Sequence, residues 1–252
     1  FRRVLFRSDF AHRGVHVTTV ASKAILRAHY GAPAQHAYFS GCSQGGQEAL
    51  TEAQRYPDDY DGVIATSPVL NWNIIHLADN RTRDRLMEGW LDASAIRLIA
   101  ERTRRSCDAA DGLTDGVIAN YLACPNDVAT LQCPAGASPP ACLSAAQVAS
   151  AWSQREPYAS HIRLANGVTT FPGYGVTGDE DGANWQWAFY PIGQEPPSKE
   201  LKPGTAWEPR RGGTLNFAAY WIRHVIVGQD DFNPAQFDPR PYQARLRDRK
   251  ST

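Results

Sequence analysis

Hydrophobic positions repeat at helical spacing in the first part of the chain. Within residues 9–30, apolar side chains recur at i, i+3, i+4, i+7, i+8 and i+11, and they are Val17, Val20, Ala21, Ala24, Ile25 and Ala28. This period predicts one amphipathic helix, which Gly31 and Pro33 end. Residues 47–55 are rich in helix formers and stop before Pro57, so they predict a second helix.

Two short apolar runs alternate with these helices. Residues 37–39 and 62–65 contain no charge and are bounded by turn-forming residues, which is typical of buried strands. The order helix, strand, helix, strand favours the α/β class. We therefore predict that residues 9–68 hold a piece of a parallel sheet with its helices.

The pattern changes after Pro68. Helices are predicted for residues 72–90, 94–105, 141–154 and 215–227, whereas residues 107–140 and 165–213 show little periodicity. All seven tryptophans lie in this later part, together with most of the 17 prolines. We therefore predict that residues 69–247 form a separate, helical and largely irregular domain that resembles a lid.

The overall composition limits the class of protein. At 252 residues and 42% hydrophobic content, the chain is long enough for one large domain or two small ones. Lys+Arg and Asp+Glu number 26 each, and a net charge of zero argues against nucleic acid or a membrane surface as partner. No apolar run approaches the roughly 20 residues of a membrane span. Residues 1–8 lack the features of a signal peptide, and we expect them and residues 248–252 to be non-native ends.

The stretch 40–46, Ser-Gly-Cys-Ser-Gln-Gly-Gly, fits the motif Gly-x-Ser-x-Gly with Gly41, Ser43 and Gly45 in the fixed places. It stands between a predicted strand and a predicted helix, where this motif makes a tight turn that exposes the serine hydroxyl above a sheet. Small residues two before and two after the serine keep strand and helix from colliding, and glycine tolerates the strained backbone. The N-terminus of the new helix favours an oxyanion nearby. The alternative is a glycine-rich loop with an ordinary serine.

Five cysteines are present, and four of them lie in the loop-rich segment 107–142. No CxxC pair and no histidine pair at zinc spacing accompany them, which argues against a zinc site. Disulfides are the better interpretation, and they imply an oxidising compartment. Because five is an odd number, one cysteine has no partner within the chain.

Several longer motifs resemble one known family. They are residues 9–16 (DFAHRGVH), 41–46 (GCSQGG), 53–62 (AQRYPDDYDG) and 107–118 (CDAADGLTDGVI). Together they resemble the tannase/feruloyl esterase family, which includes fungal feruloyl esterases, tannases and a bacterial hydrolase of mono(hydroxyethyl) terephthalate. The resemblance covers residues 9–247. It implies a partial α/β-hydrolase core, a large lid, a Ser-Asp-His triad and a structural calcium ion.

For the active site, the resemblance implies that Ser43 is the nucleophile and that Gln44 donates its backbone N–H to the oxyanion. In the family the acid and the histidine of the triad lie past the lid, and the second oxyanion donor lies upstream of residue 9. We therefore assign no residue of this chain to those three roles. His224 follows Trp221 in an apolar segment, and we expect it to be packed or hydrogen-bonded and not to be the base.

The resemblance also bears on the cysteines. The family links the cysteine before the serine, here Cys42, to a cysteine after the triad histidine, which implies that Cys42 is unpaired in this chain. The remaining four then pair as Cys107–Cys124 and Cys133–Cys142, and each short loop contributes about 2–4 kcal/mol of stability. The alternative for Cys42 is a small buried residue that never forms a disulfide.

An acidic loop is the second candidate site. Asp108, Asp111 and Asp115 are three carboxylates that repel one another unless a cation lies among them, and calcium prefers such oxygens. Their spacing is not that of an EF-hand. The family pattern adds the carbonyl oxygens of Leu113 and Val117 as ligands. The alternative is a solvated acidic loop without a metal.

Aromatic residues of the later domain are candidates for a substrate pocket, and they are Phe171, Trp185, Trp187, Phe189 and Trp221. An aromatic acyl group suits a pocket lined in this way. Aromatic side chains, however, more often serve only to pack a core. The sequence leaves both interpretations open for each residue.

Two functions from different classes are compatible with these features. The first is a serine carboxylic ester hydrolase that acts on phenolic or aromatic esters through an acyl-enzyme, with the catalytic Asp and His outside this chain. The second is a non-catalytic, calcium-stabilised binding domain derived from a hydrolase. The intact Gly-x-Ser-x-Gly motif favours the first function, and the missing base favours the second. For the first we expect a secreted or periplasmic protein with calcium as its only cofactor and a small aromatic ester as its partner.

Overall fold

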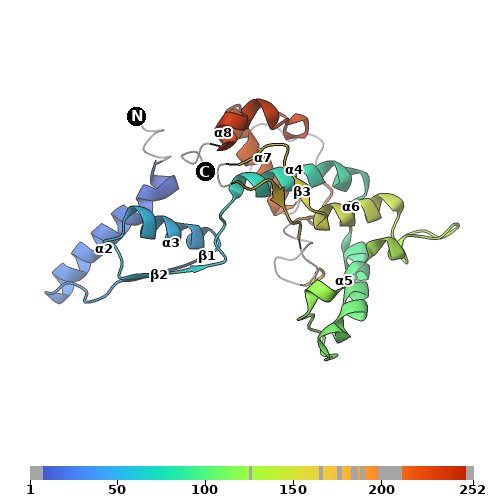
Figure 1. The fold of residues 1–252 in the computed structure, drawn as a ribbon, viewed down its shortest axis with the longest axis horizontal. Coiled ribbons are helices and arrows are strands. Elements are labelled where there is room, and N and C mark those ends of the chain that lie inside the picture. The colour runs from blue at the N-terminus through green and yellow to red at the C-terminus, as the bar shows by residue number, and fades with distance from the viewer. Residues whose placement is uncertain are drawn as a thin grey trace. The chain divides into compact units, whose positions relative to one another are not determined.

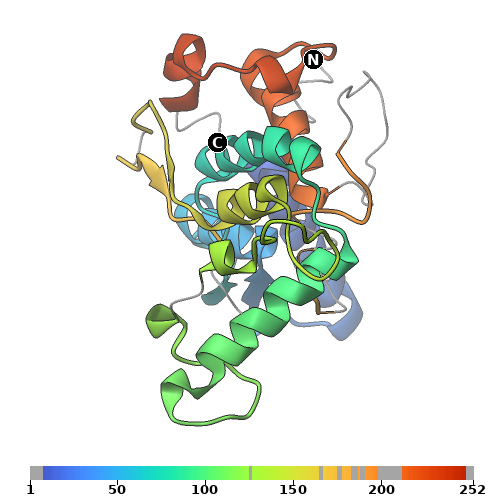
Figure 2. The same cartoon turned by 90° about the vertical axis from the view of Figure 1, so that its right-hand side faces the viewer.

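The computed structural model describes residues 8–124, 127–164, 167–174, 178–182, 187, 191–197 and 212–247. The chain separates into two compact units, Phe1–Asn71 and Trp72–Thr252. Figures 1 and 2 show the ribbon of the chain from two directions.

The first unit contains two helices and a two-stranded parallel sheet. A π-helical turn, η1 (Asp9–Arg13), runs directly into α2 (Gly14–Tyr30). Strand β1 (Tyr38–Cys42) leads into α3 (Gln44–Arg55), and β2 (Gly62–Thr66) pairs with β1 in parallel. The predicted order helix, strand, helix, strand is confirmed.

Helix α3 packs on one face of this sheet and contacts both strands, as Figure 1 shows. On the strands, Tyr38 is 68% exposed and Ile64 is 60% exposed. The apolar stripe of α2 is exposed as well, since Ile25 is 68% accessible and the only buried residue of this helix is Thr19. The helix that the sequence predicted therefore exists, but within the described residues its apolar face is not buried.

The second unit is mainly helical. Its longer helices are α4 (Trp72–Glu88), α5 (Ala93–Cys107), α6 (Ala145–Arg155) and α7 (Gly213–Tyr220), and α7 continues as the π-helix η6 (Trp221–Val227). These are the four helices that the sequence predicts, with shifted ends. No helix in the described part of the chain is both long and apolar enough to span a bilayer.

Side-chain caps explain where two of these helices begin. Asp92 accepts a hydrogen bond from the backbone N–H of Ala95, which satisfies one of the donors left free in the first turn of α5. Ser144 and Gln147 form a reciprocal capping box at the start of α6. The helix predicted to begin at residue 141 therefore begins only after Ser144.

Short elements connect the long helices. They are η2 (Asp108–Asp111), η3 (Tyr121–Ala123), η4 (Val128–Leu131), η7 (Pro234–Gln236), η8 (Arg240–Tyr242), α8 (Gln243–Arg247) and the antiparallel pair β3 (Tyr158–Ala159) and β4 (Thr170–Phe171). The segment 107–140 is loop-like as predicted, although its described part includes single turns of 3-10 helix.

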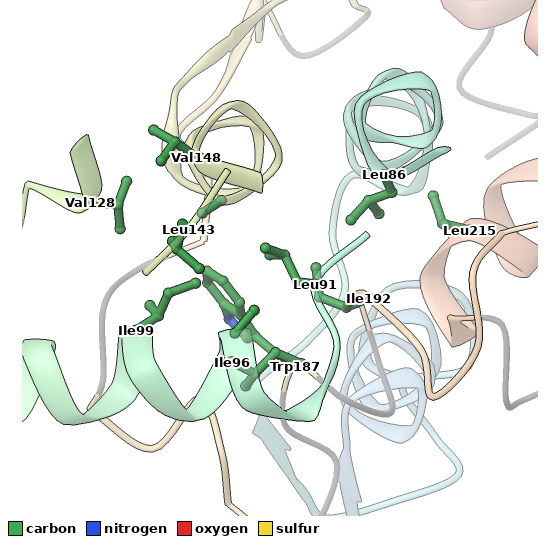
Figure 3. Packing of buried hydrophobic residues seen from close by; sticks show 12 residues of the cluster. Leu86, Leu91, Ile96, Ile99, Val128, Leu143, Val148, Trp187, Ile192 and Leu215 are labelled. Carbon is green, nitrogen blue, oxygen red and sulfur yellow. The ribbon is translucent and has the colours of Figure 1, made fainter. Parts of the chain in front are cut away.

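Two hydrophobic clusters form the core of the second unit. The first joins α5 to α6 through residues such as Ile96 and Val148, and Figure 3 shows the Trp187 ring beside Ile96. The second joins α4 to η6 through Leu77 and Ile222. Each fully buried aliphatic side chain of this size contributes about 1.5–3 kcal/mol relative to an exposed one. The second unit thus has its own core.

Candidate active site

Ser43 lies at a sharp turn between β1 and α3. Its backbone has φ 60° and ψ −115°, and L-residues other than glycine rarely adopt a positive φ. Among the described residues, Ser43 and Ser67 are the only non-glycine residues with positive φ. Such strain costs about 1–3 kcal/mol and persists where the surrounding structure holds it in place. The predicted turn is present, with the strand ending at Cys42 and the helix beginning at Gln44.

The three glycines around Ser43 meet different surroundings. A Cβ added to Gly41 would lie 2.0 Å from the backbone oxygen of Gly45, and one added to Gly46 would lie 2.6 Å from the backbone oxygen of Thr66. A Cβ added to Gly45 would meet nothing within 4 Å. The prediction that residues two before and two after the serine must be small is therefore correct at Gly41. Within the described residues it is wrong at Gly45, and Gly46 is the second position where helix and strand meet closely.

This difference predicts opposite results for two similar variants. Gly41→Ala forces a side chain into the backbone of α3, and we expect it to destabilise the first unit by about 3 kcal/mol or more. Gly45→Ala enters open space within a helix, where alanine is favoured over glycine by about 1 kcal/mol, so it should be neutral or stabilising. Amide hydrogen exchange over residues 36–66, measured by mass spectrometry, separates the two. Equal protection in both variants would contradict the geometry.

The backbone of Ser43 is held by three hydrogen bonds. Its N–H donates to the carbonyl of Thr66 (3.0 Å), and its own carbonyl accepts from the N–H groups of Gln47 (3.2 Å) and Val69 (3.4 Å). The Ser43 residue is exposed. The N–H of Gln44, the predicted oxyanion donor, belongs to the first turn of α3, where N–H groups have no acceptor within the helix. The positive end of the helix dipole lies at the same place.

Within the described residues of the first unit, no hydrogen bond joins a histidine to the Ser43 hydroxyl. His224 makes other contacts, since its Nδ1 lies 3.0 Å from Asp230 Oδ1 and its ring centroid lies 4.2 Å from that of Tyr220. These contacts agree with the prediction from the sequence that His224 is packed or hydrogen-bonded. The described residues of the first unit therefore present a candidate nucleophile without a histidine base beside it.

A cluster of titratable side chains, which the sequence pattern does not predict, joins η1 and α2 to the segment that follows α3. His16 Nδ1 lies 2.6 Å from Asp59 Oδ2, and the His16 ring stacks on Tyr56 at 4.0 Å. His12 Nδ1 lies 2.7 Å from the Tyr56 hydroxyl. The two histidines stand one helical turn apart, which is a sequence signal for a shared face. The cluster follows the C-terminal end of α3, whereas Ser43 precedes the N-terminus of α3. We therefore interpret the cluster as a set of contacts that stabilises the fold and takes no part in catalysis.

Helix α4 buries ionisable side chains in the second unit. Asp79 is 2% exposed, and its Oδ1 accepts a hydrogen bond from the Tyr174 hydroxyl at 2.7 Å. Its Oδ2 has no hydrogen-bond partner among the described residues. Burial raises the pKa of Asp79 to about 7, and burial lowers the pKa of His76 to about 4. The sequence signals only that α4 is helical and rich in charge.

Both predicted disulfides are present. Cys107 bonds to Cys124 and Cys133 bonds to Cys142, with Cα atoms 5.0 Å and 4.9 Å apart. These distances lie within the range that disulfides allow. Cys42 is free, as the resemblance implies. It is also exposed, so the alternative of a small buried cysteine is wrong for the described part of the chain.

The acidic loop turns its carboxylates toward its own backbone. Asp108 Oδ1 accepts a hydrogen bond from the N–H of Asp115 at 3.2 Å. Asp111 accepts from the N–H groups of Leu113 and Ala119, both at 3.0 Å. These hydrogen bonds hold the pKa of the Asp111 carboxyl below its usual range. The loop is thus ordered by bonds that it makes within itself.

The loop has oxygen ligands of the kind that calcium prefers, but its three carboxylates do not meet at one point among the described residues. Carboxylate and carbonyl oxygens are the ligands that calcium takes in proteins. Within the described residues, however, no group of three or more His, Cys, Asp or Glu side chains is placed so that it could hold a metal ion. The expected convergence of Asp108, Asp111 and Asp115 on one point is therefore not seen. Calcium at this loop stays a prediction.

The described aromatic candidates pack against the core. Trp187 is buried in the first cluster. Phe171 and Trp221 are partly buried against the second cluster. Trp185 and Phe189 lie outside the described residues. For Trp187 the packing interpretation holds, because a side chain that is 6% exposed offers no surface to a substrate.

Comparison with known proteins identifies similar sequences. A family model described as "Tannase and feruloyl esterase" matches residues 6–196. "Feruloyl esterase B" of Aspergillus niger is 28% identical over 245 residues, which are 92% of this chain and 44% of that protein. "Probable feruloyl esterase B-2" of Aspergillus terreus is 29% identical over 242 residues, which are 94% of this chain and 41% of that protein. The chain thus spans less than half the length of these relatives.

Solved structures share the fold. The crystal structure of feruloyl esterase B from Aspergillus oryzae matches with a TM-score of 0.71 at 24% identity, over 96% of this chain and 44% of that one. Tannin acyl hydrolase from Aspergillus niger matches with a TM-score of 0.58 at 19% identity, over 94% of this chain and 42% of that one. At these identities the likeness concerns the fold alone.

Proposed function

Because this chain belongs to the tannase and feruloyl esterase family, we propose that it carries the nucleophile of a serine carboxylic ester hydrolase. The observation that carries this proposal is the strained backbone of Ser43 between a parallel strand and the N-terminus of a helix. A serine in this position presents its hydroxyl beside N–H groups with no intrahelical acceptor, and acyl transfer requires both.

The proposed reaction proceeds in two steps. Ser43 Oγ attacks the ester carbonyl carbon and gives its proton to a base, while the N–H of Gln44 stabilises the negative oxygen of the tetrahedral intermediate. The carbon–oxygen bond to the alcohol then breaks, and the alcohol leaves with the proton from the base. Water attacks the acyl-enzyme in the same way and releases the acid. The base and its orienting carboxylate belong, in this proposal, to a longer protein that contains this chain.

The substrate class in this proposal is phenolic or aromatic esters. The relatives named above are feruloyl esterases and a tannin acyl hydrolase, and these names refer to acyl groups or substrates of that kind. The two disulfides support a place of action in an oxidising compartment, which for this protein means the periplasm or the outside of the cell. Nucleic acid and membranes are not expected as partners.

Covalent trapping tests the proposed function. We expect an aryl phosphonate to modify the longer protein on the peptide that contains Ser43, as located by mass spectrometry. Ser43→Ala should abolish the adduct, whereas Ser22→Ala, at an exposed position of α2, should leave it intact. An adduct that survives in Ser43→Ala would refute the assignment. If Ser43 is not labelled but an aromatic ester still stabilises the folded protein, the result would favour the non-catalytic binding domain.

We also propose that the acidic loop binds calcium as a structural ion. The support is the chemistry of its three carboxylates, since a bound cation would relieve their repulsion. A ligand that binds only the folded state raises its stability by about 2.7 kcal/mol at 100 times its dissociation constant. We therefore expect excess calcium to raise the melting temperature of the chain by several degrees relative to EDTA. Asp111→Asn should reduce this shift, and an identical melting temperature in both conditions would contradict the site.

A further inference from the structure

Besides Ser43, Ser67 is the other residue of the first unit with a strained backbone, and it lies beside Ser43. It has φ 44°, and it directly follows Thr66, the last residue of β2. Ser43 directly follows Cys42, the last residue of β1, and the register pairs Cys42 with Thr66. Ser43 and Ser67 therefore stand at matching positions, one residue beyond the carboxyl ends of two adjacent parallel strands. In open α/β sheets, ligands bind at this edge.

The structure on both sides of Ser67 holds its backbone in place. Thr66 accepts the hydrogen bond of the Ser43 N–H, and Val69 donates to the Ser43 carbonyl, so the segment between them is attached to the nucleophile at both ends. A Cβ on Gly46 would lie 3.0 Å from the Cα of Pro68, which shows how closely the first turn of α3 packs on this segment. The position of Ser67 is thus fixed relative to Ser43.

The Ser67 hydroxyl has no structural role among the described residues. The residue is exposed, and no hydrogen bond to its side chain is made in the described part of the chain. A serine costs strain at a positive φ that glycine would avoid. A strained, exposed polar residue that is fixed beside a nucleophile is a functional candidate, because strain of this kind clusters at active sites.

We propose that Ser67 is a positioning residue for the ester that Ser43 attacks. Its hydroxyl forms a hydrogen bond to an oxygen-bearing substituent of the ester, either on the acyl ring or on the alcohol, where the ester extends over the carboxyl end of β2. This inference rests on the proposed ester hydrolysis. One hydrogen bond of this type contributes about 0.5–1.5 kcal/mol, which corresponds to a factor of about 2–12 in kcat/KM.

Steady-state kinetics of the longer protein on three esters test the inference. Methyl 4-hydroxybenzoate carries the substituent on the acyl part, 2-hydroxyethyl benzoate carries it on the alcohol, and methyl benzoate has neither. We expect Ser67→Ala and Ser67→Gly to lower kcat/KM for one substituted ester about 3- to 10-fold more than for methyl benzoate, mainly through KM. Ser67→Asn, which tolerates a positive φ and keeps hydrogen-bonding groups, should restore most of the preference. Ser22→Ala is the control.

The outcomes separate this inference from the proposed function. Equal losses on all three esters, or a Ser67→Gly variant as selective as the natural protein, would show that the strain serves only the fold and would overturn the inference. If Ser43→Ala abolishes turnover while every Ser67 variant keeps the natural preference, the proposed function stands and the role of Ser67 is refuted. If turnover survives in Ser43→Ala, the proposed function itself fails, and this inference fails with it.

Discussion

Turnover of an aromatic ester is expected to fall about a million-fold when Ser43 is replaced by alanine in a longer protein that contains this chain. The magnitude follows from how a nucleophile and its base act as a unit: removing either one costs about as much as removing both. The binding of the ester should change little, because the variant removes one oxygen from an exposed residue. Hydrolysis of methyl benzoate, followed by chromatography, measures the loss, and Ser22→Ala serves as the matched control.

The 252-residue chain by itself should show no hydrolysis that depends on Ser43. Its first unit places a serine at a strained turn, but no described histidine of that unit is hydrogen-bonded to the hydroxyl. A serine hydroxyl without a base is a weak nucleophile. Turnover by this chain that disappears in Ser43→Ala would show that a base exists within these residues. His161 and His224 would then be the first to test, since the pKa of His76 is lowered to about 4 by burial.

The second large effect is expected at Asp79. A carboxyl with a pKa of about 7 in the folded state and 3.8 in the unfolded state keeps its proton on folding between these two values. The folded state therefore binds more protons in this window, and the free energy of unfolding falls as the pH rises from about 4 to about 7. The full difference is about 4 kcal/mol at about 1.4 kcal/mol per pKa unit. Above pH 7 the Asp79 carboxyl is ionised in both the folded and the unfolded state. Its buried charge then still lowers the free energy of unfolding.

Asp79→Asn should remove this cost and keep the hydrogen bond from Tyr174. We expect the variant to match the natural chain near pH 4 and to exceed its free energy of unfolding by several kcal/mol at pH 8. His76 has the opposite slope, because its lowered pKa makes the folded state bind fewer protons below pH 6.5. Since His76 is present in both chains, its contribution cancels in the difference.

Tryptophan fluorescence in urea gives the required free energies. All seven tryptophans belong to the second unit, which also contains Asp79, so the signal reports on that unit alone. A difference between the two chains that does not grow from pH 4 to pH 8 would contradict the raised pKa. Asn80→Ala, a neutral change one residue along the same helix, should shift stability without any dependence on pH.

Local chemistry in the sequence was sufficient to predict the elements around Ser43. A glycine-bounded serine between an apolar run and a helix-forming segment leaves few conformations other than a tight turn, and the turn is present. The family resemblance implied the cysteine pairing, and both disulfides are present. Helix ends were less accurate where a cap such as Ser144 decides the first residue.

Contacts between distant residues could not be predicted in this way. The pairing of His16 with Asp59 joins residues 43 positions apart, and neither residue signals the other locally. The close contact at Gly46 depends on how the turn after β2 passes over α3, which the Gly-x-Ser-x-Gly spacing does not specify. Whether the apolar stripe of α2 is covered depends on what packs against it, and periodicity does not reveal the partner.

The two disulfides have a consequence for proteolysis. They close loops with sequence separations of 17 and 9, and most residues inside these loops are exposed. Exposed loops with small and polar residues are where proteases cut first. A cut within either loop leaves both pieces joined through sulfur, so α5 and α6 remain parts of one covalent molecule and the nick becomes visible only after reduction. In a compartment that contains proteases, a single cut in either of these exposed loops would therefore separate nothing.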